Sequence, residues 1–266
     1  MAFSNFRQRI GNSLSLLSVF FIAVSAVAAN KPSEAQLAAI TARGRLLAAF
    51  DEAAWKATDA VQATQPPQDL VQRYIARKAE NGWVVDFGRL NDAQDKFIVA
   101  YEAVQSGPSA PFTVKRLDPV REDTGWNLVA AKAVDAALAD FRGEDRPYNA
   151  AELPDDSTGL YVYVYPAQVK ADVYPLGGDV RYHFAANGSL LEKRGLHKGI
   201  LEPAPLPPGT TPAGGYHTHV LSDLPEDTDV FLVLTRKPRM PEFVAAGKLI
   251  YKVNVDGSIS NAGPLK

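Results

Sequence analysis

The chain has 266 residues and no cysteine, which excludes a disulfide framework and a lipid-modified lipoprotein. Its 28 Lys and Arg against 30 Asp and Glu leave a formal net charge of −2. Lys and Arg do not cluster into a basic stripe, so nucleic acid and anionic membrane surfaces are poor candidate partners.

The N-terminal segment has the three-part pattern of a secretory signal peptide. Arg7 and Arg9 precede an apolar run over residues 14–28, which ends in small residues. This run is shorter than the roughly 20 apolar residues that span a bilayer. We therefore predict that residues 1–28 are removed as a cleavable signal peptide. The remaining chain is expected to be a soluble periplasmic or secreted protein without membrane association.

The region 29–123 shows helical periodicity followed by strand composition. A helix is predicted over 33–64, with an interruption near Gly44, and a shorter helix over 69–82. Two segments rich in aromatic and β-branched residues, 83–90 and 96–104, are separated by a polar turn. They predict a β-hairpin packed on the preceding helix.

A turn-rich segment, residues 106–125, marks the best internal boundary, and we place the second region at 124–266. A surface helix is predicted over 126–142, followed by a polar linker. Strands are predicted in four segments, with hairpin turns at Asn187-Gly188 and Asp256-Gly257: 160–166, 179–196, 214–220 and 248–260. The sequence thus predicts an α+β fold, with N-terminal helices and a β-hairpin before a mostly antiparallel C-terminal sheet carrying a packed helix.

Two of the four histidines, His217 and His219, lie two residues apart on a predicted strand. Side chains alternate along a strand, so both imidazoles point to one face, about 7 Å apart at Cα, and can reach one metal ion. Zinc commonly takes histidine nitrogen and carboxylate oxygen. Four acidic residues follow closely and offer a third ligand: Asp223, Glu226, Asp227 and Asp229.

This order resembles the JAB/MPN (JAMM) metalloprotease family, whose pattern is His-x-His, a short loop, and Ser-x-x-Asp opening a helix. The resemblance assigns His217, His219 and Asp229 as metal ligands, and Pro225 takes the place of the proline often found before the serine. It extends over residues 126–266, although the specific residues lie within 215–230. It implies a zinc site, a peptide or protein substrate and metal-dependent hydrolysis of a peptide or amide bond.

Two features depart from the family pattern. Glu226 occupies the place of the serine that stabilises the oxyanion, where a hydrogen-bond donor is needed. The family's catalytic glutamate is expected 45 to 55 residues before the first histidine, yet residues 157–191 contain no glutamate. Glu192 or Glu202 could replace it from a neighbouring strand. The catalytic residues are therefore unknown, and the enzymatic assignment stays uncertain.

Other interpretations stay open. The paired histidines can be exposed residues without a ligand, and His183 and His197 are expected to be partly buried or on the surface. The proline-rich segment 202–215 is either the rim of a cleft or a long connection. The alternative function is a non-enzymatic exported binding protein of unknown partner, in which the N-terminal half presents aromatic residues such as Trp83 and Tyr101.

Overall fold

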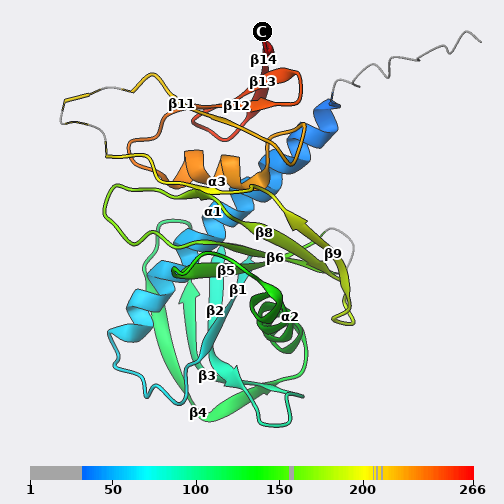
Figure 1. Ribbon diagram of the computed structural model, residues 1–266. Helices are drawn as coiled ribbons and strands as arrows, with labels where there is room; N and C mark the ends of the chain where they lie inside the picture. The colour runs from blue at the N-terminus through cyan, green and yellow to red at the C-terminus, as the bar shows by residue number, and fades with distance from the viewer. Residues whose placement is uncertain (1–31, 156–158, 206, 208, 211) are drawn as a thin grey trace, which may run out of the picture. The chain divides into compact units, whose positions relative to one another are not determined.

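The computed structural model describes residues 32–155, 159–205, 207, 209–210 and 212–266 (Figure 1). The predicted signal peptide lies outside these residues. The first element is helix α1 (Glu34–Gln62), which Ser33 begins with a capping box: its Oγ accepts from the backbone N–H of Gln36. The predicted interruption at Gly44 is wrong, because α1 is one continuous helix. No helix among the described residues combines the length and apolar character needed to span a membrane.

The N-terminal sheet has four antiparallel strands in chain order: β1 (Arg73–Ala79), β2 (Gly82–Leu90), β3 (Phe97–Gln105) and β4 (Phe112–Asp123). The β2–β3 hairpin confirms the prediction. The helix predicted over 69–82 is wrong, since the middle half of that segment is β1. The turn that ends at Asn81 joins β1 to β2, and the register pairs Ala79 with Gly82.

Strand β4 runs through the segment that the sequence indicated as a turn-rich boundary, so that part of the prediction is also wrong. Its pairing with β3 is interrupted by a register shift between Val99 and Tyr101. Such an irregular strand carries no sustained alternation of burial, which explains why periodicity did not reveal it. The division into regions 29–123 and 124–266 itself stays a prediction.

The second sheet has the order β5-β6-β8-β9 and is antiparallel throughout. Helix α2 (Trp126–Asp140), which confirms the predicted surface helix, precedes it. The strands are β5 (Tyr148–Pro154), β6 (Leu160–Pro166), β8 (Val180–Phe184) and β9 (Leu190–Gly195), and the short pair β7 (Leu176–Gly177) and β10 (Ile200–Leu201) lies beside them. Strand β5 occupies part of the predicted polar linker and was not expected.

The C-terminal sheet has the order β11-β12-β13-β14, and helix α3 (Asp227–Thr235) lies between β11 and β12 in the chain. The strands are β11 (Gly215–Thr218), β12 (Glu242–Ala246), β13 (Leu249–Val253) and β14 (Ile259–Pro264). Strands β11 and β12 are parallel, whereas the other pairs are antiparallel. The β8–β9 and β13–β14 hairpins contain the two predicted turns, with φ of 82° at Gly188 and 83° at Gly257.

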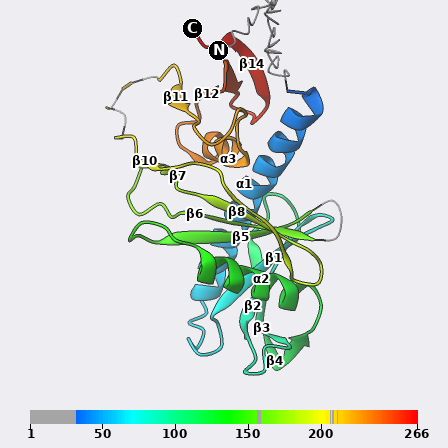
Figure 2. The same ribbon diagram turned by 45° about the vertical axis from the view of Figure 1, so that its right-hand side comes forward.

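Helix α1 runs past both the N-terminal sheet and α3 (Figures 1 and 2). Its side chain Phe50 packs in one core with Val85 of β2 and Tyr163 of β6, so this core joins both predicted regions. A second core lies under α2, and a third joins Ile40 of α1 to α3 and the C-terminal sheet. The α+β class is confirmed.

Candidate metal centre

Three histidines and one aspartate converge in the described part of the chain: His197, His217, His219 and Asp229. Each offers one ligand atom, and these atoms all lie within 4.8 Å of one another. The Nε2 atom of His219 is 2.9 Å from that of His197 and 3.1 Å from that of His217. The carboxylate of Asp229 lies 3.0 to 3.2 Å from all three imidazoles.

Each ligand comes from a different local setting. His217 is on β11 and His219 follows its end, where its backbone N–H donates to the carbonyl of Ala245. Asp229 lies in the first turn of α3, and its Oδ2 accepts from the backbone N–H of Glu226, which fixes the carboxylate. His197 follows β9, about 20 residues before the other histidines. The structure thus brings the three predicted ligands together and adds His197, for which no ligand role was expected.

The Nδ1 atom of each imidazole, on the side away from the cluster, also has a hydrogen-bond partner. Nδ1 of His197 lies 2.8 Å from Asp179, and Nδ1 of His217 lies 2.9 Å from Glu242. Nδ1 of His219 lies 2.8 Å from the carbonyl oxygen of Leu224. Partners of this kind fix the orientation and tautomer of metal-binding histidines. All three Nε2 atoms are therefore directed at one point.

The cluster is closed to solvent. The exposed fractions of the side chains are 8% for His197, 2% for His217, 1% for His219 and 0% for Asp229. Taking a carboxylate and three imidazoles out of water is unfavourable unless they are paired with opposite charge. Their convergence in such a place indicates a bound cation or a bound proton.

The pKa values of the cluster residues also indicate a bound cation or bound protons. Burial opposes ionisation of Asp229, but the charge of His197 and hydrogen bonds from the three imidazoles hold the pKa of this carboxyl well below its usual value. Burial likewise opposes protonation of His197, yet the Asp179 and Asp229 carboxylates raise its pKa to about 11. The pKa of His217 rises to about 9 against its burial, through Asp229 and Glu242. Without a cation, the site therefore holds protons that a metal ion must displace.

The spacing suits a four-ligand site. Zinc binds histidine nitrogen and carboxylate oxygen at about 2.0–2.2 Å, which places neighbouring ligands of a tetrahedron about 3.3 Å apart. Five of the six pairs of ligands are 2.9 to 3.2 Å apart, slightly less than this value, and all four ligand atoms lie within 4.8 Å of one another. A metal ion would need a small outward movement of the side chains in these five pairs.

The other acidic residues considered as a third ligand have different partners. Asp227 is fully buried and binds Arg43, Arg181 and the hydroxyl of Tyr163, so it joins α1, β6 and β8 to α3. Glu226 lies 2.5 Å from Arg194. Asp223 is not a member of the cluster.

The two glutamates considered as a replacement base also have other partners. Glu192 lies 3.8 Å from Arg181, and Glu202 lies 2.8 Å from Arg146. His183 is paired with Asp155 at 2.6 Å and is partly exposed, as predicted.

A cleft of about 610 Å³ opens beside His217. Its lining includes Pro203, Pro205 and Gly214, so the proline-rich segment does border a cleft. By contrast, Trp83 and Tyr101 are buried, at 8% and 3% exposure. They offer no exposed aromatic surface to a partner.

Comparison with family models, curated proteins and solved structures found no match for this chain. The resemblance to the JAB/MPN family therefore stays a prediction. What can be concluded about function depends on the geometry of the cluster.

Proposed function

We propose that His197, His217, His219 and Asp229 bind one zinc ion and that this ion stabilises the fold of an exported protein. The observation that carries the proposal is the convergence of four protein donor atoms within 4.8 Å. Three of these donors are imidazoles held from behind by a second partner. Imidazole and carboxylate ligands in a four-coordinate arrangement are typical of zinc.

The positions of the ligands support a structural role. His197 extends from the second sheet, His217 and His219 belong to the C-terminal sheet, and Asp229 belongs to α3. An ion bound to all four residues would link these three parts of the fold. It would also hold together the two ends of the chain segment between His197 and His217. Because the chain contains no cysteine, no disulfide provides such a link.

Metal-dependent peptide hydrolysis of the JAB/MPN type is the second candidate, and the cleft beside His217 is the observation that favours it. Catalytic zinc sites keep one position for water beside three protein ligands. In the four-ligand arrangement proposed above, His197 would take the position that this water needs. The hydrolytic interpretation therefore requires that His197 is not a ligand, and this requirement can be tested.

Metal content tests the first proposal. The chain lacking residues 1–28 is purified, and bound metal is measured by mass spectrometry. We expect about one zinc ion per chain, and loss of most zinc in His217→Ala and Asp229→Ala. The control is His183→Ala, which removes a histidine outside the cluster. Equal, substoichiometric metal in all four proteins would refute the proposal.

His197→Ala separates the two candidates. If the site is structural, the His197→Ala variant loses affinity for zinc. X-ray absorption spectroscopy of the parent protein then shows three imidazoles bound to the zinc ion. A bound ligand raises stability by about 4 kcal/mol at a thousandfold excess over Kd, so chelation should lower Tm by roughly 8–16 °C. A hydrolase would instead show two imidazoles, and His197→Ala would retain zinc and metal-dependent cleavage of a peptide substrate.

A further inference from the structure

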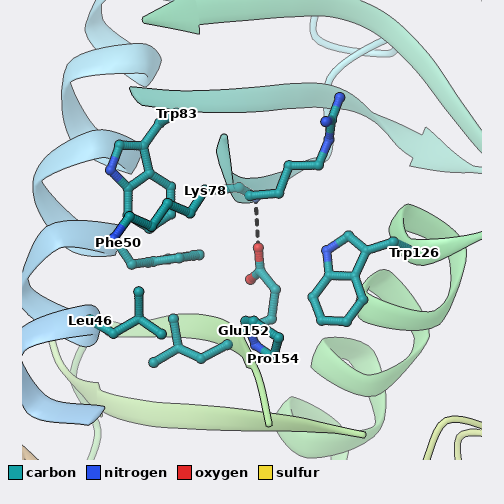
Figure 3. A pocket seen from close by; sticks show the side chains of 10 residues that line it. Leu46, Phe50, Lys78, Trp83, Trp126, Glu152 and Pro154 are labelled. Carbon is teal, nitrogen blue, oxygen red and sulfur yellow. Dashed lines mark hydrogen bonds between the residues drawn. The ribbon is translucent and has the colours of Figure 1, made fainter. Parts of the chain in front are cut away.

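A second cavity, separate from the metal centre, lies between α1, β1, β2, α2 and β5 (Figure 3). Its volume is about 200 Å³. The lining residues are Leu46 and Phe50 of α1, Ala76, Arg77 and Lys78 of β1, Trp83 of β2, Trp126 of α2, and Glu152, Leu153 and Pro154 of β5. Most of this wall is apolar or aromatic, and a single acidic group lies within it.

That acidic group is Glu152, whose side chain is directed between the aromatic rings (Figure 3). It is 1% exposed, and its Oε1 accepts a hydrogen bond of 2.8 Å from the backbone N–H of Ala76. It forms no ion pair with any described residue. Burial raises the pKa of Glu152 to about 8, and it outweighs the hydrogen bond from Ala76 and the charge of Arg73, which both lower it. At neutral pH the carboxyl therefore keeps its proton and can donate a hydrogen bond.

Trp126 provides a second donor. Its indole Nε1 is buried and has no hydrogen-bond partner among the described residues. Buried indole N–H groups usually have a partner, and the absence of one is unfavourable. In Figure 3 the indole lies across the cavity from the carboxyl of Glu152. A ligand with an acceptor atom would satisfy both groups.

The remaining polar lining is basic. Arg77 and Lys78 contribute to the cavity wall, and Arg77 is only loosely paired, at 3.8 Å from Asp86. Every polar side chain that lines the cavity can therefore donate at neutral pH. This set favours an acceptor of negative charge and disfavours an organic cation, although aromatic walls alone would also suit a cation.

The apolar wall determines the size of the ligand. Phe50 and Trp83 meet edge to face, with ring centroids 6.1 Å apart, and Leu46 and Leu153 complete the surface. A cavity of about 150 Å³ lined by apolar side chains holds a benzene molecule. The present volume accommodates one six-membered ring with a small substituent.

We infer that this cavity binds a small aromatic carboxylate of single-ring size, with the ring against Phe50 and Trp83 and the carboxylate accepting from Trp126 and Glu152. A neutral carboxyl that donates to a carboxylate forms a short, charge-assisted hydrogen bond. Lys78 adds opposite charge at the wall. This binding site does not depend on the proposed metal centre.

Fluorescence tests this inference, because two of the three tryptophans, Trp83 and Trp126, line the cavity. The third, Trp55, is 54% exposed and is replaced by Phe to remove its signal. Benzoate is titrated into the otherwise full chain lacking residues 1–28, with benzylamine as the probe of opposite charge. We expect saturable binding of benzoate and at least tenfold weaker binding of benzylamine. Absence of saturation, or preference for benzylamine, would overturn the inference.

The pH dependence identifies Glu152 as the donor. Above pH 8, affinity for benzoate should fall by up to tenfold per pH unit as Glu152 loses its proton. Arg73, Tyr74 and Tyr165 interact electrostatically with this carboxyl, but none of them can supply the proton that Glu152 loses. Glu152→Gln retains a donor, so it should bind benzoate without this loss. The same loss in the glutamine variant would contradict the assignment.

Trp126→Phe is the matched variant for the second donor, since it keeps an aromatic ring and removes the N–H. Trp83 stays as the fluorescent reporter. We expect about tenfold weaker binding of benzoate, and circular dichroism confirms that the variant is folded. Unchanged affinity would show that Nε1 does not contact the carboxylate and would overturn the proposed binding mode.

Discussion

The Nδ1 atom of His197 lies 2.8 Å from Oδ1 of Asp179, the residue before β8. Asp179 is 2% exposed, and its second oxygen is buried without a hydrogen-bond partner among the residues that the structure describes. The pair directs Nε2 of His197 toward His219 and Asp229. Because His197 lies outside any regular element, the orientation of its ring depends on this carboxylate.

We therefore expect Asp179→Ala to weaken metal binding without removing a ligand. Replacing an outer partner of a metal-binding histidine typically lowers affinity by about tenfold to a hundredfold. Competition with a chromophoric chelator measures the affinity of the purified chain for zinc. The control is Asp92→Ala, since Asp92 is fully exposed and has only a 3.7 Å contact with Arg89. Equal zinc affinity in the two variants would contradict the role given to Asp179.

A second prediction concerns Asp227, the buried carboxylate next to the metal centre. It binds Arg43 at 2.9 Å and Arg181 at 2.7 Å, and it accepts from the hydroxyl of Tyr163 at 2.7 Å. Asp227→Asn leaves these guanidinium groups without their counter-charge, which should cost about 3–5 kcal/mol of unfolding free energy. Urea denaturation in excess zinc measures the loss.

Tyr163→Phe is the graded control for that experiment. It removes one hydrogen bond to Asp227 and keeps the aromatic ring, so we expect a loss of only about 1 kcal/mol. If both variants lose the same free energy, the charge of Asp227 is not what stabilises the contact between α1 and α3.

A third prediction concerns the pH dependence of stability. Burial raises the pKa of Glu152 from an ordinary value near 4.5 to about 8. Between these values the unfolded chain has released the proton and the folded chain retains it, so stability falls as pH rises through this window. The loss attributable to Glu152 is up to about 5 kcal/mol at pH 8 and above.

Glu152→Gln should remove this contribution. The difference in unfolding free energy between the variant and the parent chain isolates Glu152, since other buried acids titrate in both proteins. The variant should gain stability relative to the parent as pH rises from 5 to 8. Glu80→Gln, which changes an exposed glutamate, serves as the control. Parallel pH profiles for the parent and Glu152→Gln would contradict a raised pKa.

The sequence predicted those parts of the site that local pattern determines. His217 lies on β11 and His219 directly follows it, so the alternation along a strand connected these two. Spacing placed Asp229 among four nearby acidic residues, and the resemblance to the JAB/MPN family selected it. His197 could not be found this way. It joins the cluster only because the β8–β9 hairpin and the C-terminal sheet meet in space, and its neighbouring sequence has no feature of a ligand.

The fold shows the same division between local and non-local information. Helix α1 and the β2–β3 hairpin follow from periodicity and were predicted. Strand β1 was predicted as a helix because Leu70, Val71, Tyr74 and Ile75 also match helical spacing. In the structure this segment is a strand instead, because β1 pairs along its whole length with β2. Over so short a segment, pairing with a partner strand outweighs intrinsic periodicity.

The last prediction concerns Gly44. The sequence indicated a helix break at this residue, whereas the structure has a close contact there between α1 and α3. A Cβ atom built at Gly44 would lie 2.5 Å from the carbonyl oxygen of Asp227 and 2.5 Å from Cβ of Val230 in α3. Alanine is favoured over glycine within a helix by about 1 kcal/mol, whereas overpacking a core costs about 1–3 kcal/mol. Since backbone of α3 is among the atoms in contact, we expect the overpacking to prevail and Gly44→Ala to destabilise the protein.

The control is Gly107→Ala, where a Cβ atom would meet nothing within 4 Å. Thermal unfolding of the two variants measures the difference, and a gain of stability in Gly44→Ala would show that α1 and α3 do not approach this closely.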